Sequence, residues 1–120
     1  MIKGIGIDMI ELKRIERVLS RQPRFLKRIL SGAEMELYEQ LPSKKRKIEF
    51  LAGRFAAKEA YSKAVGTGIG VHHSFRSIEI LRGASGEPRV CYEGKLKPLV
   101  HVSISHSKEY AIAQVIVEKD

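Results

Sequence analysis

The stretch from Arg54 to Gly70, RFAAKEAYSKAVGTGIG, gathers residues that could do chemistry at the end of a predicted helix. Glu59, Ser62 and Lys63 stand at positions i, i+3 and i+4, which share one helical face. A carboxylate, a hydroxyl and an ammonium therefore project side by side, just before glycines that let the backbone approach a ligand closely. The pattern fits either a solvated face, with Glu59 and Lys63 as an ion pair, or part of a site for a phosphorylated, metal-bound substrate.

Asp8 is a second candidate, because it lies late in IKGIGIDMI, an otherwise apolar segment that alternates like a strand. A carboxylate there is costly unless it is paired, hydrogen-bonded or bound to a metal. It could equally cap the helix that follows. Together with Glu59 it would suit Mg²⁺, which prefers one or two protein oxygens with water and substrate phosphate in the other positions. The sequence alone leaves open whether residues 8 and 59 meet.

A third polar group stands near the C-terminal end, where His106 and Ser107 begin a predicted hairpin turn in VSISHSKEY. A lone histidine in a turn is more often structural than functional. The GTGIG stretch lacks the Gly-Lys-Ser/Thr of a P-loop and follows a helix C-terminus. Any affinity for phosphate there has to come from Lys63, other cations and loop N–H groups.

The composition limits the classes to which the protein can belong. A length of 120 residues with 43% hydrophobic residues predicts one domain over residues 1–120 with a real core. The net charge of +8 favours an acidic partner such as nucleic acid, an anionic membrane, a nucleotide or an acidic protein. Cys91 is the only cysteine, which excludes an internal disulfide. No secretory signal and no apolar run of about 20 residues is found, so we expect a cytoplasmic protein.

The elements that position these residues follow from hydrophobic spacing and cap residues. Residues 2–10 are predicted to form a strand, followed by a helix before Pro23 and a helical piece over 24–30. Ser31 and Glu34 form a capping box for a helix that runs to about residue 41. Ser43 caps a long helix that ends near residue 65, with Gly66 just past its end. Residues 76–82, 88–93, 100–105 and 110–117 then read as strands.

This order predicts an α+β fold in which a mainly antiparallel sheet packs on the long central helix. The last strand, over 110–117, is apolar on both faces, whereas a small half-covered sheet alternates more cleanly. One face would then pack on the long helix and the other on a second subunit. A helix on each face would give the same sequence pattern.

Three segments together resemble one family. GIGIDMIEL near the start, FLAGRFAAKEAYSKAVGTGIG in the middle and VHVSISHSKEYAIAQV near the end match, in order, the holo-acyl-carrier-protein synthases. These are the small members of the 4'-phosphopantetheinyl transferase superfamily. The likeness covers nearly the whole chain, and a G-I-D strand followed by F-x-x-K-E-A-x-x-K is highly specific. The turn is S-H-S where many relatives have S-H-T. Met9 and Ile10 supply no second acidic ligand beside Asp8, whereas the larger, two-half transferases have an acidic residue two positions on.

The resemblance implies a 4'-phosphopantetheinyl transferase-like fold and activity. Such an enzyme moves the phosphopantetheine arm of coenzyme A onto a serine of apo-acyl carrier protein, releases adenosine 3',5'-bisphosphate and supports fatty acid biosynthesis. Members of the family form homotrimers with active sites between neighbouring subunits. This agrees with a last strand that is apolar on both faces.

The resemblance also implies roles for single residues. Asp8, Glu59 and Lys63 would be catalytic, with Asp8 and Glu59 binding Mg²⁺ and Lys63 contacting phosphate or stabilising charge on the leaving group. Coenzyme A would be bound by Arg54, Ser62, Lys63, Gly66, Thr67, Gly68, Ile69, Gly70, His106 and Ser107. The base that takes the serine proton stays open between a metal-bound water or hydroxide and a carboxylate acting directly.

The first predicted helix is strongly basic, since residues 13–28 contain seven basic residues and one acidic residue. A solvated face is the simpler explanation. Acyl carrier proteins are strongly acidic, however, and the family resemblance implies that they dock on this helix. We therefore expect a carrier protein to be bound by Arg14, Val18, Arg21, Arg24, Phe25 and Arg28, with the arginines steering it. The basic run over 43–47 has no comparable assignment.

Two other functional classes fit parts of the sequence. A nucleic-acid-binding module would explain the charge, but no RNP, KH or zinc-finger pattern is present and aromatic residues are only 7%. A coenzyme A-dependent acyltransferase would use the thioester and would need no metal, so the pair of Asp8 and Glu59 argues against it. We expect coenzyme A and an acidic acyl carrier protein as partners, and neither nucleic acid nor a membrane.

Overall fold

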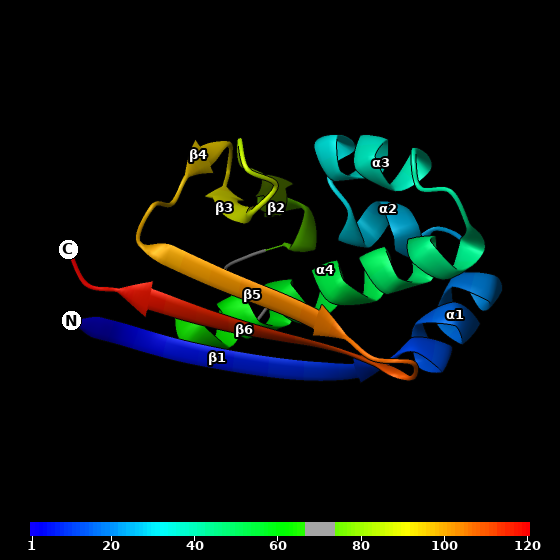
Figure 1. The fold of residues 1–120 in the computed structure, drawn as a ribbon, viewed down its shortest axis with the longest axis horizontal. Helices are drawn as coiled ribbons and strands as arrows, with labels where there is room; N and C mark the ends of the chain where they lie inside the picture. Colours follow the sequence, from blue (N-terminus) through cyan, green and yellow to red (C-terminus); the bar gives the residue numbers. More distant parts are fainter. Residues whose placement is uncertain (67–73) are drawn as a thin grey trace.

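Two antiparallel sheets lie beside one long helix in the computed structural model of the chain, which describes residues 1–66 and 74–120 (Figure 1). The larger sheet has the order β1-β6-β5, with β1 (Ile2–Glu11), β6 (Tyr110–Glu118) and β5 (Val100–His106). The smaller sheet has the order β2-β3-β4, with β2 (Ile78–Arg82), β3 (Pro88–Tyr92) and β4 (Lys95–Leu96). The helices are α1 (Leu12–Arg21), α2 (Phe25–Ile29), α3 (Gly32–Glu39), α4 (Lys44–Ala64) and the 3-10 helix η1 (Phe75–Ser77). The predicted antiparallel sheet on a long central helix is confirmed, although it is split into two sheets.

Helix α4 begins and ends where its cap residues predict. The Ser43 hydroxyl oxygen accepts the backbone N–H of Arg46 at 3.2 Å, which satisfies one of the free donors of the first turn. At the other end, Val65 is the C-cap and Gly66 follows with a φ of +82°, a conformation that favours glycine. The helix is 21 residues long, so it spans both sheets and can carry functional residues at several levels.

Strand β1 lies unusually close to α4 because two of its residues lack side chains. A Cβ added to Gly4 would lie 1.9 Å from the carbonyl oxygen of Ala64, and one added to Gly6 would lie 1.9 Å from that of Ala60. Side chains alternate along a strand, so Asp8 lies on the same face as these two glycines. The close contact therefore brings the Asp8 carboxylate to the last turns of α4.

The capping box predicted at Ser31 and Glu34 is present, and Glu34 does more than cap α3. Its carboxylate is fully buried, lies 2.5 Å from the equally buried Nζ of Lys58, and accepts the backbone N–H of Ile80 at 2.9 Å. Lys58 also donates to the carbonyl oxygen of Ile29 at 2.6 Å. This buried ion pair connects α2, α3, α4 and β2.

The outer face of the larger sheet is uncovered, and it is apolar along β1. Ile5, Ile7 and Met9 of β1 are between 53% and 60% exposed, and Ile112 of β6 is 37% exposed. On the opposite face of β6, four side chains are buried against α4: Ala111, Ala113, Val115 and Val117. Among residues 1–66 and 74–120 no helix covers the outer face, so the alternative of a helix on each face does not hold for this part of the chain. None of the helices in the same part is long and apolar enough to cross a membrane.

Candidate active site

Asp8, Glu59 and Lys63 come together where β1 crosses α4. The Nζ of Lys63 lies 3.2 Å from Oδ1 of Asp8 and donates a second hydrogen bond to the carbonyl oxygen of Ile7 at 3.0 Å. Asp8 and Glu59 line one cavity of about 340 Å³. The question left open by the sequence is therefore answered, because residues 8 and 59 meet.

The structure differs from the two simpler predictions for these residues, a helix cap at Asp8 and a solvated face with an ion pair between Glu59 and Lys63. Asp8 is no helix cap, since Glu11 occupies the N-cap position of α1 and makes no side-chain cap hydrogen bond. Within the described part of the chain, Lys63 forms its ion pair with Asp8 and not with Glu59. Ser62 is only 2% exposed while the Lys63 side chain is 55% exposed, so their helical face is not uniformly solvated. Thr67, Gly68, Ile69 and Gly70 lie outside the described residues.

The surroundings of Glu59 in this cavity disfavour its charged form. Partial burial raises the pKa of Glu59, the negative charge of Asp8 raises that pKa further, and Lys63 lowers it in part. Oxygens from two neighbouring carboxylates fit a hard divalent cation such as Mg²⁺. No group of three or more His, Cys, Asp or Glu residues that could hold a metal exists in residues 1–66 and 74–120, so water and substrate would complete the coordination.

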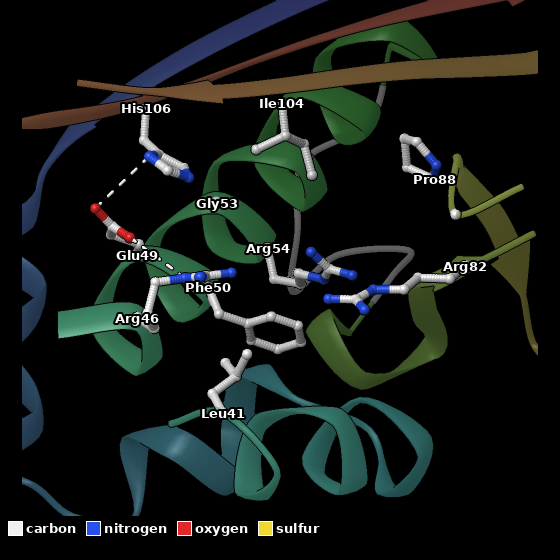
Figure 2. A pocket seen from close by; sticks show the side chains of 11 residues that line it. Leu41, Arg46, Glu49, Phe50, Gly53, Arg54, Arg82, Pro88, Ile104 and His106 are labelled. Carbon is white, nitrogen blue, oxygen red and sulfur yellow. Dashed lines mark ion pairs between the residues drawn. The ribbon is translucent and has the colours of Figure 1, made fainter. Parts of the chain in front are cut away.

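A second cavity, of about 310 Å³, is rich in cationic side chains (Figure 2). Arg46, Arg54, Arg82 and His106 line it, and they come from α4, β2 and the end of β5. The sequence predicted Arg54 and His106 as ligand-binding residues and missed Arg46 and Arg82. Arg46 belongs to the basic run over 43–47, in which no single residue stands out as a ligand-binding residue. No sequence pattern shows that Arg82 faces Arg54. The charge of the three arginines makes this cavity suited to an anion.

Arg54 is fixed in this second cavity by its surroundings. Its Nη2 donates to the carbonyl oxygen of Ile80 at 3.1 Å, and its guanidinium lies 4.1 Å from the centre of the Phe50 ring. Burial lowers its pKa to about 10, with Glu34 opposing and Arg82 adding to that shift, so the group stays charged at neutral pH. Its buried Nε has no hydrogen-bond partner in the described part of the chain. The charged guanidinium of Arg54 is therefore held in a fixed position at the cavity.

The two cavities are separate within one chain. As far as the described residues define them, the cavity of Asp8 and Glu59 and the cavity of Arg54 and His106 have no lining residue in common. Ser107, predicted to bind coenzyme A, accepts the backbone N–H groups of Glu109 and Tyr110 through its hydroxyl oxygen, at 3.4 and 3.2 Å. Its hydroxyl thus shapes the turn between β5 and β6.

Three of the residues predicted to bind a protein partner border the first cavity. Arg14, Val18 and Phe25 line it together with Asp8 and Glu59. Arg21 lines a different groove, between α1 and the start of α4, and Arg24 and Arg28 are exposed. A macromolecule docked on α1 would therefore be close to both carboxylates.

Comparison with known proteins gives a consistent result. A family model described as the 4'-phosphopantetheinyl transferase superfamily matches residues 4–115. A holo-[acyl-carrier-protein] synthase of Anoxybacillus flavithermus is 56% identical over 119 residues, which cover 99% of this chain and 98% of the relative. One of Staphylococcus aureus is 50% identical, with the same two shares covered.

Solved structures agree with the sequence relatives. The crystal structure of a holo-(acyl-carrier-protein) synthase from Bacillus anthracis, in complex with CoA (3',5'-ADP), has a TM-score of 0.88 and 52% identity, covering 100% of this chain and 99% of that one. The Helicobacter pylori synthase in complex with coenzyme A has a TM-score of 0.80 and 35% identity, covering 95% and 99%. The chain therefore belongs to the 4'-phosphopantetheinyl transferase superfamily, among its holo-[acyl-carrier-protein] synthases, and is a phosphopantetheinyl transferase.

Proposed function

We propose that this enzyme transfers the 4'-phosphopantetheine arm of coenzyme A to a serine of an apo-acyl carrier protein and releases adenosine 3',5'-bisphosphate. The observation that supports this most directly is the meeting of Asp8, Glu59 and Lys63 in one place. Phosphoryl transfer is catalysed mainly by positioning and by offsetting charge, which these three groups can do.

Asp8 and Glu59 would hold Mg²⁺, because their oxygens suit this ion. Partial burial, and then the charge of Asp8, raise the pKa of Glu59, and a bound cation would stabilise its ionised form. When bound, Mg²⁺ supplies charge stabilisation and polarises the phosphate under attack. Lys63 reaches the same place from the last turn of α4, so its ammonium can offset the charge that develops on the departing phosphate.

The nucleotide end of coenzyme A would bind in the second cavity. Coenzyme A carries a 3'-phosphate in addition to its pyrophosphate, and Arg54 and His106, with Arg46 and Arg82, offer positive charge for it. The remaining proposed nucleotide contacts are Ser62, Gly66, Thr67, Gly68, Ile69, Gly70 and Ser107.

A homotrimer with each active site between neighbouring subunits would join the two cavities. Coenzyme A needs both the carboxylate cavity and the cationic cavity, which one chain keeps apart. The uncovered apolar face of Ile5, Ile7, Met9 and Ile112 provides a surface for association. One protomer would then supply Asp8, Glu59 and Lys63, and the next would supply Arg54 and His106.

The acyl carrier protein would dock on α1. Arg14, Val18 and Phe25 lie at the rim of the carboxylate cavity, so an acidic protein bound there could present its serine to the phosphate. Arg21, Arg24 and Arg28 would add long-range attraction. In this role the enzyme would act in the cytoplasm and support fatty acid biosynthesis.

The test is the intact mass of an apo-acyl carrier protein after incubation with this enzyme, coenzyme A and Mg²⁺. We expect a gain of one phosphopantetheine that disappears with EDTA and with Glu59→Ala. Glu36→Ala, which removes an exposed carboxylate from α3, is the matched control and should retain activity. A gain that survives both EDTA and Glu59→Ala would contradict the metal assignment. No gain on several carrier proteins would contradict the proposed function, and nucleic-acid binding would be tested next.

A further inference from the structure

Glu49 is the one carboxylate among the described residues that line the cationic cavity, and it is only 8% exposed. Its Oε2 lies 3.6 Å from Nδ1 of His106, and its Oε1 lies 3.8 Å from Nε of Arg46 (Figure 2). A nearly buried carboxylate is costly unless cations lie beside it. The guanidinium of Arg46 supplies a cation beside Glu49, and the ring of His106 lies on the other side as a second polar neighbour.

The same contacts determine which nitrogen atoms of His106 and Arg46 remain for a ligand. Because Glu49 faces Nδ1 of His106, the other ring nitrogen, Nε2, lies on the side of the ring away from the carboxylate (Figure 2). Which ring nitrogen interacts with a ligand is commonly set by the partner of the other nitrogen. Because Glu49 faces Nε of Arg46, the two terminal amino groups of that guanidinium remain for a second partner.

Glu49 also connects two elements that are far apart in sequence. It stands in the second turn of α4, whereas His106 is the last residue of β5. Arg54 and Arg82 complete the cationic lining and repel one another, as the effect of Arg82 on the pKa of Arg54 shows. A negative group placed among three arginine side chains reduces the repulsion between them.

We propose that Glu49 is a positioning residue for binding of a phosphate monoester in this cavity, directing Arg46 and His106 toward the phosphate without touching it. This inference rests on the proposed function, in which the phosphate is the 3'-phosphate of coenzyme A. A carboxylate that contacted the phosphate would repel it. Glu49 acts through its two partners, and its charge is required for that.

The test measures binding of adenosine 3',5'-bisphosphate and of adenosine 5'-monophosphate by calorimetry, in EDTA, for the wild-type protein and Glu49→Gln. The glutamine keeps the shape of the side chain and removes its charge. We expect the wild type to prefer the bisphosphate, and Glu49→Gln to lose about tenfold of that preference, because charge-assisted contacts to the 3'-phosphate are misdirected. Glu49→Asp keeps the charge and should retain most of the preference, and Glu36→Gln on α3 should retain all of it.

Kinetics give a second readout that a merely structural role would not produce. With coenzyme A, Glu49→Gln should raise KM for coenzyme A about tenfold, with kcat and KM for the carrier protein little changed. With dephospho-coenzyme A, which lacks the 3'-phosphate, the same change should have no effect on KM.

The outcomes separate this inference from the proposed function. An inactive wild type that still prefers the bisphosphate would contradict the transferase proposal and leave the binding test of Glu49 valid. Equal losses for the two nucleotides, or for coenzyme A and dephospho-coenzyme A, would overturn the role of Glu49. If Glu49→Gln does not fold, Glu49→Ala, which also removes the charge, replaces it in both readouts, and the same outcomes apply.

Discussion

Lys63 donates to Asp8, and this single contact sets the charge balance around the two carboxylates. The ammonium offsets one carboxylate, while Glu59 has no ion pair among the described residues and is partly buried. Such an arrangement is unfavourable for the protein alone and favourable for binding a cation. The residues whose charges interact unfavourably, Asp8 and Glu59, are therefore those expected to bind the metal ion in the reaction.

Glu59→Gln should stabilise the metal-free protein at neutral pH. The pKa of Glu59 is higher in the folded chain than its ordinary value, mainly because of burial and then because of Asp8. The folded state therefore binds a proton more readily over the interval between the two pKa values, and the stability contributed by this group falls as pH rises through it. Above that interval the wild type carries the cost of a partly buried charge, and glutamine does not.

This prediction is checked by thermal unfolding in EDTA across acidic to neutral pH. The variant should have the higher Tm at neutral pH, and the difference should shrink as the pH falls and Glu59 becomes protonated. Glu36→Gln on α3 is the control for loss of an exposed carboxylate. A difference in Tm that does not depend on pH would contradict the electrostatic explanation.

Lys58→Met should destabilise the protein strongly, although Lys58 belongs to neither cavity. Burial lowers the pKa of Lys58, and Glu34 opposes that shift through its charge and hydrogen bond. Removing the lysine would leave the fully buried Glu34 carboxylate without its cation, which typically costs about 3–5 kcal/mol. Urea unfolding measures the loss. Adding Glu34→Gln to Lys58→Met should recover part of it, and a loss below about 1 kcal/mol for the single variant would disagree with a buried ion pair.

At the scale of elements, the sequence predicts the helix ends that are determined by neighbouring residues. The capping box at Ser31, the Ser43 cap and the glycine after Val65 each depend on neighbouring residues, and all three are confirmed. The two-residue strand β4 was missed, because it is too short to show alternation. The facing of Arg46 and Arg82, and the pairing of Glu34 with Lys58, depend on how distant segments pack, so no local pattern reveals them.

The junction of β1 and α4 gives a prediction for this scale. Gly6→Ala would place a Cβ 1.9 Å from the Ala60 carbonyl oxygen, which belongs to helix backbone and cannot yield as a side chain would. The strand should move away from the helix, costing at least about 1–3 kcal/mol and separating Asp8 from Glu59. Chemical denaturation measures the first effect, and the Mg²⁺ concentration needed for half-maximal activity measures the second, which should rise.

Gly32→Ala is the matched control for Gly6→Ala. An added Cβ at Gly32 meets no atom within 4 Å, and the residue is the first of helix α3. Its stability and Mg²⁺ requirement should be close to those of the wild type. If Gly6→Ala behaved in the same way, the glycines would not be what sets the distance between β1 and α4.

At the scale of the whole molecule, the chain presents exposed apolar side chains on one sheet face and two cavities that share no lining residue among those described. The exposed side chains of Ile5, Ile7 and Met9 are costly in water, and a partner subunit would cover them. Ile7→Lys should therefore yield a smaller species by light scattering and lose transferase activity. Ala33→Lys adds the same charge at an exposed position of α3 and should change neither property.

A mixing experiment tests whether neighbouring subunits share each active site. Glu59→Ala removes the carboxylate half, and Arg54→Ala removes the cationic half, so each variant alone should be nearly inactive. In a ring of subunits mixed at equal amounts, about one quarter of the interfaces combine an intact carboxylate half with an intact cationic half, and the mixture should recover about that share of wild-type activity. Glu59→Ala mixed with Asp8→Ala should recover nothing, because both changes affect the same half. If each site lay within one chain, neither mixture could recover activity, and the separation of the two cavities would need another explanation.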